Sequence, residues 1–190
     1  MDYKHLMKTV LKSHPSRITH TLNVLEVAKE LGQIYQANLQ TLETAALLHD
    51  ITKYYKKEQH LTLIPDHQLI KDLKLPLYHP ISANYYAKSL GIEDEGVLEA
   101  IKYHMWGKID MKLETMILVV SDYCEPSRTF KQAKDVYKLA KENLLDAYLL
   151  AIESTINHLI KTNKTPHNNQ LEVYHYYKGE AYARKNNKNH

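Results

Sequence analysis

The stretch LETAALLHDITK, residues 42–53, carries the strongest signal for fold and chemistry in this sequence. Three apolar residues precede His49 at helical spacings and share one helix face with it: Leu42, Ala45 and Ala46. The spacing predicts a helix over about 40–53 that points the imidazole of His49 into the core, beside the carboxylate of Asp50. A single histidine in this position is usually a core residue bonded to a backbone carbonyl, so the rest of the chain must decide its role.

Three further histidines stand at core-facing positions of other predicted helices. His20 leads the apolar stripe of a helix over about 17–35. His79 stands just before a helix over about 80–90, and His104 follows apolar residues at the end of another helix. Four imidazoles from four helices are therefore expected to point inward.

Asp122 adds a second carboxylate to this set. It ends the run MILVVSD in a predicted helix over 111–124, which is apolar nearly all round and therefore the expected central helix. A buried carboxylate without a partner is costly, so it needs a cation or strong hydrogen bonds. Imidazoles and carboxylates that converge on one core suit a pair of transition-metal ions. The predicted metal ligands are His20, His49, Asp50, His79, His104 and Asp122.

The composition fits an all-α protein. Of the 190 residues 44% are hydrophobic, whereas five Gly and six Pro offer few turn signals for a β-rich fold. A helix capped by Asp94 and a long helix over about 141–161 complete the predicted bundle, and residues 166–177 give no clear pattern. We predict a single domain over residues 1–182 and a disordered polar tail over 183–190.

Charge and cysteine content argue against several classes of protein. The net charge of +3 is too mild to indicate a nucleic-acid partner. Cys124 is the only cysteine, which excludes an intramolecular disulfide and a CxxC zinc site and fits a reducing compartment. The N-terminus lacks the apolar core of a signal peptide, and no apolar run is long enough to span a membrane. We expect a cytoplasmic protein without a membrane partner, and a homodimer is left open.

The order of the six predicted ligands resembles the HD-domain phosphohydrolase superfamily in its dinuclear form. The finer resemblance is to the YqeK family, the symmetrical bis(5′-nucleosyl)-tetraphosphatases of bacteria. It covers about residues 15–175. The matching segments are RITHTLNV (17–24), AALLHDITK (45–53), YHPISA (78–83), AIKYHMWG (100–107) and SDYCEPSR (121–128).

The resemblance implies a helical HD fold with a buried dinuclear metal site, commonly of iron, although manganese also suits such ligands. It implies a metallophosphohydrolase that cleaves diadenosine tetraphosphate into two ADP through a metal-bridged hydroxide. On this chain, Asp50 would bridge the two metals. His20, His49, Asp50 and Asp122 would hold one, and His79 and His104 would bind the other.

Further site residues follow from the resemblance and from their positions. Lys53 is the predicted catalytic partner of Asp50, because its ammonium lies on the helix face of His49 and can reach a phosphate. Arg17, Lys53 and Arg128 are predicted to bind phosphates. Trp106 and Tyr123 are predicted to stack on adenine, and Glu125 to orient Lys53 or Arg128. The alternatives are surface cations, aromatic packing in the core and a helix cap.

Two alternatives to this function remain. Where Thr-Thr usually follows the equivalent of His104 in the family, this chain has Met105-Trp106, so another nucleotide, such as a nucleoside monophosphate or a signalling nucleotide, is the competing substrate. A non-catalytic nucleotide sensor would be expected to lack a metal ligand, and none is missing. The remaining histidines, with His167 left unassigned, are predicted to lie on the surface: His5, His14, His60, His67, His158, His175 and His190.

Overall fold

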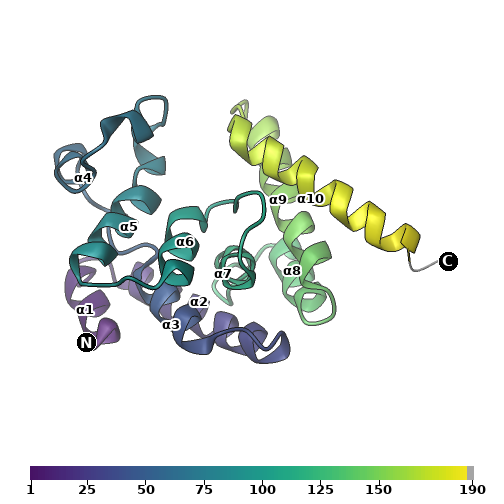
Figure 1. The fold of residues 1–190 in the computed structure, drawn as a ribbon, viewed down its shortest axis with the longest axis horizontal. Coiled ribbons are helices and arrows are strands. Elements are labelled where there is room, and N and C mark those ends of the chain that lie inside the picture. Colours follow the sequence, from purple (N-terminus) through teal and green to yellow (C-terminus); the bar gives the residue numbers. More distant parts are fainter. Residues whose placement is uncertain (188–190) are drawn as a thin grey trace.

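The structure, a computed structural model, describes residues 1–187. Within these residues the chain is helical and contains no strand, which confirms the all-α prediction (Figure 1). The α-helices are α1 (Tyr3–Val10), α2 (Pro15–Ile34), α3 (Leu39–Leu48), α4 (Lys57–Leu63), α5 (His79–Ser89), α6 (Glu95–Tyr103), α7 (Leu113–Cys124), α8 (Lys131–Ala140), α9 (Leu144–Lys161) and α10 (Asn168–Asn187). Two short 3₁₀ helices, η1 (His67–Ile70) and η2 (Leu75–Leu77), separate α4 from α5.

Helix α7 lies at the centre of the molecule, as its apolar sequence predicts. Its side chains Ile117, Leu118 and Val120 are fully buried. Helices α2, α3 and α6 pack against it from one side, and α8 and α9 pack against it from the other (Figure 1). Asp122 therefore enters the site from the most central element of the fold.

Helix α2 carries His20, helix α3 leads directly into His49, and the two helices pack closely. The closest approach involves Gly32 of α2, where an added Cβ would lie 2.5 Å from Cδ1 of Leu42. Because a larger residue at position 32 would clash with α3, a glycine allows these two helices to pack as they do.

Helix α6 begins at the predicted cap. The carboxylate of Asp94 accepts hydrogen bonds from the backbone N–H groups of Gly96 (2.7 Å) and Val97 (3.1 Å). Its second oxygen accepts the hydroxyl of Thr41 on α3 at 3.0 Å. One side chain thus caps α6 and joins it to the helix that leads to His49.

Replacing Asp94 with alanine is expected to lower the free energy of unfolding by about 1–2 kcal/mol, because the cap and the contact with Thr41 are both lost. Chemical denaturation of the variant measures this loss. Glu93→Ala, a neighbouring exposed carboxylate, serves as the control and should unfold like the parent chain. Equal stability of the Asp94 and Glu93 variants would contradict the proposed role of the cap.

The structure differs from the predicted helix pattern in three places. The helix predicted over 40–53 ends at Leu48, and residues 49–54 form turns, in which the hydroxyl of Thr52 donates to the carbonyl of His79 at 3.1 Å. Helices α1, α4 and α8 were not predicted. Helix α10 continues to Asn187, so residues 183–187 of the predicted tail are helical, and residues 188–190 lie outside the described residues. Among the described residues, no helix is both long enough and apolar enough to cross a membrane.

Candidate metal centre

The structure brings all six predicted metal ligands together at one site. His20 lies within α2, Asp122 lies within α7, and the other four residues lie at helix ends. His49 and Asp50 directly follow α3, His79 is the first residue of α5, and His104 directly follows α6. All except Asp122, whose side chain is 21% exposed, are buried.

Asp50 stands between two pairs of histidines. Its Oδ2 atom lies 3.5 Å from Nε2 of His49 and 3.8 Å from Nε2 of His20. Its Oδ1 atom lies 3.0 Å from Nε2 of His79 and 3.7 Å from Nε2 of His104. His20, His49 and Asp50 form one group whose potential ligand atoms lie within 4.8 Å of one another, and Asp50, His79 and His104 form a second. A carboxylate that gives one oxygen to each group has the geometry of a bridging ligand.

Asp122 adjoins the first of these groups. Its Oδ1 atom lies 3.0 Å from Nε2 of His20. The first group therefore offers the imidazoles of His20 and His49 with the carboxylates of Asp50 and Asp122. The second group offers the imidazoles of His79 and His104 with the same Asp50.

The four histidines are oriented by hydrogen bonds at their other ring nitrogen. Nδ1 of His20 lies 3.1 Å from Oε1 of Glu125, and each of the other three contacts the backbone carbonyl three residues earlier. These contacts are His49 to Ala46 (2.7 Å), His79 to Pro76 (2.8 Å) and His104 to Ile101 (2.8 Å). Carbonyl and carboxylate oxygens only accept, so each Nδ1 must carry the proton. Each Nε2 then presents a lone pair to the centre of the site, as a metal ligand does.

Buried polar atoms at the centre test whether the residues fit a pair of cations. Nε2 of His20, Nε2 of His49 and Oδ1 of Asp50 are buried and have no hydrogen-bond partner among the described residues. Nε2 of His79 and Nε2 of His104 lie only 3.1 Å apart, although both are acceptors when Nδ1 is protonated. Unpaired buried acceptors that face one another are costly, and cations between them remove that cost. The donor set therefore fits two divalent transition metals.

The pKa values of His79, His104 and the carboxylates agree with a ligand set of neutral imidazoles and ionised carboxylates, whereas the pKa of His49 is raised, because its burial is outweighed by the charges of Asp50 and Asp122. Burial, together with the neighbouring His49 and His79, lowers the pKa of His104 to about 3. Burial also lowers the pKa of His79. Burial would raise the pKa of Asp50, but His49, His79 and Lys53 outweigh it and hold this pKa well below its usual range.

Two cationic side chains contact the carboxylate of Asp50, one at each oxygen. Nη1 of Arg17 lies 2.8 Å from Oδ2 of Asp50. Nζ of Lys53 lies 3.4 Å from Oδ1 of Asp50 and 3.0 Å from Nε2 of His79. Lys53 was expected on the helix face of His49, which is wrong because α3 ends before it, but the turn still brings its ammonium to the site.

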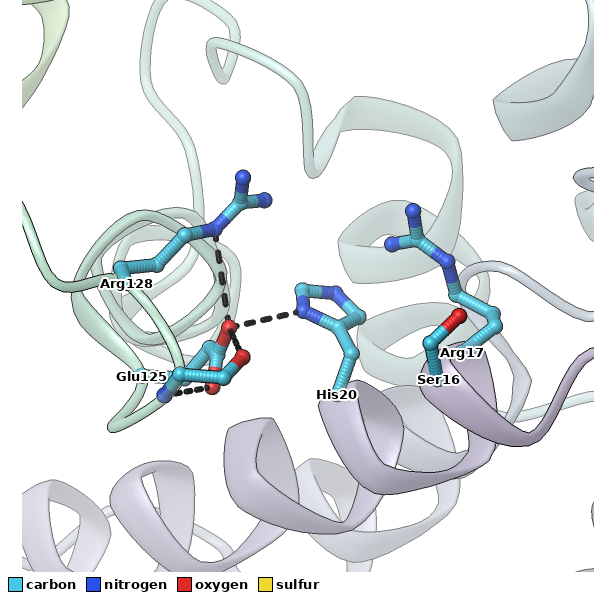
Figure 2. A pocket seen from close by; sticks show the side chains of 6 residues that line it. Ser16, Arg17, His20, Glu125 and Arg128 are labelled. Carbon is cyan, nitrogen blue, oxygen red and sulfur yellow. Dashed lines mark hydrogen bonds and ion pairs between the residues drawn. The ribbon is translucent and has the colours of Figure 1, made fainter.

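A polar cavity of about 200 Å³ opens beside His20. Figure 2 shows the guanidinium groups of Arg17 and Arg128 on opposite sides of the His20 ring. Nη2 of Arg128 lies 3.8 Å from Oδ1 of Asp122, and its side chain is 41% exposed. Two guanidinium groups beside a cation site suit an anionic ligand such as phosphate.

Comparison with known proteins agrees with this geometry. The family model of the HD domain matches residues 17–127, the segment that holds all six predicted ligands. The chain belongs to the HD-domain family.

Relatives with curated names refine this assignment. The HD-domain chain is 35% identical to the "Bis(5′-nucleosyl)-tetraphosphatase, symmetrical" of Halalkalibacterium halodurans, over 89% of its own length and 91% of that protein. It is also 35% identical to the protein of the same name in Bacillus subtilis, over 83% of its own length and 86% of that protein. These relatives confirm the YqeK-like resemblance and identify the chain as an HD-domain hydrolase.

A solved structure shares the fold. The crystal structure of a predicted HD superfamily hydrolase involved in NAD metabolism from Clostridium acetobutylicum matches with a TM-score of 0.83. The two chains are 29% identical, and the match covers 93% of the HD-domain chain and 97% of the other.

Glu125 makes one of its two predicted contacts, with Arg128, and an unpredicted contact with His20. It is buried and does not contact Lys53; its carboxylate instead pairs with Nδ1 of His20 and accepts a hydrogen bond from Nδ2 of Asn23 at 3.0 Å. It also accepts hydrogen bonds from the backbone N–H (2.7 Å) and hydroxyl of Ser127, and it lies 3.6 Å from Nε of Arg128. Glu125 thus orients a candidate ligand, and the predicted contact with Arg128 is present (Figure 2).

The two predicted adenine-stacking residues lie in different places. Trp106 stacks on His167 with ring centroids 5.3 Å apart, so one of its faces is already covered. Tyr123 lines a second cavity with Asp122 and Arg128, and its hydroxyl donates to Ser154 at 2.7 Å. The structure therefore places Tyr123 beside a cavity at the candidate metal centre, whereas one face of Trp106 is covered by His167.

His60 was predicted to lie on the surface, but it is buried, with 2% of its surface exposed. Its Nδ1 atom lies 2.7 Å from the hydroxyl of Ser82, which lies 2.8 Å from the hydroxyl of Thr52. Both hydroxyls donate to the backbone carbonyl of His79, at 3.2 and 3.1 Å. This buried network connects α4 to the backbone of a candidate metal ligand.

Replacing His60 with alanine is expected to lower the free energy of unfolding by about 2 kcal/mol, because it leaves a cavity and removes one hydrogen-bond partner of Ser82. A loosened His79 should also lower the amount of metal retained after dialysis by a few-fold. Denaturation and elemental mass spectrometry measure the two effects. His158→Ala, an exposed histidine on α9, should change neither, and equal metal retention in both variants would contradict the link to His79.

Proposed function

We propose that this HD-domain hydrolase cleaves diadenosine tetraphosphate symmetrically into two ADP and requires two transition-metal ions. The observation that carries the proposal is the position of Asp50 between two pairs of histidines. The curated names of the relatives, which cover most of the chain, supply the substrate.

The six residues His20, His49, Asp50, His79, His104 and Asp122 would hold the two cations, which we propose to be iron, with manganese as the alternative. When bound, such cations activate water as a nucleophile and neutralise charge on phosphoryl oxygens. Asp50 would bridge them, which is its proposed catalytic role.

The cationic side chains bind and orient the polyphosphate in this proposal. Arg17 and Arg128 face the polar cavity from both sides, so a phosphate between them can accept hydrogen bonds from two guanidinium groups. Lys53 adds a positive charge beside Asp50 and His79, where it can stabilise the charge that develops on the attacked phosphoryl group. ADP leaves through a phosphate oxygen of low basicity, so no strong general acid is needed.

The test is to incubate the purified protein with diadenosine tetraphosphate and to separate the products by chromatography, with and without a chelator. Two molecules of ADP, formed only without the chelator, support the proposal. ATP plus AMP would contradict symmetric cleavage. No turnover by metal-loaded protein would contradict the substrate.

Another nucleotide substrate remains the second candidate, because Met105 lines the cavity next to Asp122. A residue that differs from the family's usual threonine at this place can alter which nucleotide fits. Assay of nucleoside monophosphates and signalling nucleotides beside diadenosine tetraphosphate separates the two. A higher kcat/KM for one of them would favour this candidate.

A further inference from the structure

A second cavity of about 220 Å³ lies against the metal centre, on the side of α7 that faces α9. Its wall is mostly apolar and includes Met105, Tyr123, Phe130 and Ile152. Asp122 and Arg128 supply its charged groups, and both also belong to the surroundings of the first predicted metal. The cavity therefore continues directly from the site described above.

The wall of this cavity offers flat apolar surface and few free hydrogen-bonding groups. The rings of Tyr123 and Phe130 meet edge to face, with centroids 5.6 Å apart and planes at 83°. The hydroxyl of Tyr123 is used by Ser154, and that of Thr155 donates to the carbonyl of Ala151 at 2.9 Å. A planar aromatic ligand is better matched to such a wall than a sugar or a phosphate.

Phe130 also has an unusual exposure for its size. It directly precedes α8, and 44% of its surface is exposed although it borders the cavity. The ring of Phe130 meets Tyr123 edge to face and remains partly exposed, so it retains ring surface that a ligand can contact.

The two cavities share Arg128, which separates a polar compartment from an apolar one. Arg17, His20 and Glu125 line the polar side, and Met105, Tyr123 and Phe130 line the apolar side. Each cavity is smaller than the roughly 300–1,000 Å³ of pockets that enclose a whole drug-sized ligand. Each cavity therefore has room for part of a nucleotide. The polar cavity suits the anionic phosphates, and the apolar cavity suits the planar base.

We propose that the apolar cavity binds a nucleobase of the substrate, with Phe130 and Tyr123 as its aromatic wall and Met105 as the residue that adjusts its fit. This inference rests on the proposed function, because it assigns the place of the base in the same nucleotide. Phosphates in the polar cavity and a base in the apolar cavity would both contact Arg128, which fixes the orientation of the nucleotide relative to the metals.

The test compares the binding of ADP and of inorganic pyrophosphate to the metal-loaded protein by calorimetry. Phe130→Ala is expected to weaken ADP binding by about 10-fold, since loss of one stacking contact weakens binding about 5- to 150-fold. Pyrophosphate binding should not change, because pyrophosphate has no base. Phe130→Tyr should restore ADP binding, and Lys131→Ala, an exposed neighbour on α8, should bind both ligands like the parent chain.

A second variant fills the cavity. Thr155→Phe adds a ring at its wall and should weaken ADP binding while leaving pyrophosphate binding and the helical circular-dichroism spectrum unchanged. Unchanged ADP affinity in both variants, or an equal loss for ADP and pyrophosphate, would overturn the base site even if the protein cleaves diadenosine tetraphosphate. Selective loss of ADP binding in a protein that does not cleave this substrate would support the base site and reject only the proposed reaction.

Discussion

Asp50→Asn is expected to lower turnover of diadenosine tetraphosphate by about 10³-fold or more, because the bridge between the two groups of histidines loses its charge. The amide is nearly isosteric, so the backbone turn after α3 should persist. It offers one oxygen in place of two, however, and cannot serve both sides of the site. Initial rates at saturating substrate, together with metal content by elemental mass spectrometry, measure the effect.

Asp135→Asn is the matched control for this prediction. Asp135 lies on α8, where its exposed carboxylate pairs, among the described residues, only with Lys131, so its variant should retain parent activity and metal content. If the Asp50 variant keeps two metals and a rate within a few-fold of the parent, Asp50 is not the bridging ligand.

Glu125→Ala is expected to weaken metal binding by about 10- to 100-fold, the effect of removing a hydrogen-bond partner from a ligating histidine. Without Glu125, Nδ1 of His20 loses its only carboxylate acceptor, and the ring is free to turn or to change tautomer. Titration of the apo-protein with Mn²⁺, followed by calorimetry, measures this loss. The conservative variant Glu125→Gln keeps an acceptor at the same place and should recover part of the affinity.

A purely structural role of Glu125 would lower stability without a change in metal affinity. Denaturation of the metal-free variants separates the two roles. Glu142→Gln, an exposed carboxylate between α8 and α9, should leave both quantities unchanged. A Glu125→Ala protein with parent metal affinity would rule out the assignment of Glu125 as the residue that positions His20.

The sequence predicts the centre of the site well because its signals are local. His20 lies on the apolar stripe of its helix, so helical period shows that it faces inward. Asp122 ends a helix that is apolar nearly all round, so its place in the core follows from the burial of the whole helix. His49 was placed correctly although its predicted helix extends too far, since its apolar neighbours all lie in the preceding turns. The contact between Glu125 and His20 joins residues 105 positions apart, and no pattern along the chain shows it.

Other features were missed for different reasons. Helix α8 has a regular helical stripe, Ala133, Val136 and Ala140, within a lysine-rich segment, so its prediction was possible from the sequence and was not made. His60 lies in a seven-residue helix, too short for a reliable period, and its burial depends on Ser82 and Tyr78 from another part of the chain. Phe130 precedes α8, so helical periodicity cannot assign it to a helix face. The cavity that it lines lies between α7 and α9, which the sequence alone does not bring together.

The carbonyls that orient His49, His79 and His104 come from the same turns as the histidines themselves. Each of these three rings is hydrogen-bonded within a unit of four consecutive residues. The folded chain already orders these three rings, so the affinity for cations would not be lowered by the entropy cost of ordering them. The residues of α8 and α9 supply none of these three carbonyls, so substitutions along α8 and α9 are expected to leave the orientation of the three rings unchanged.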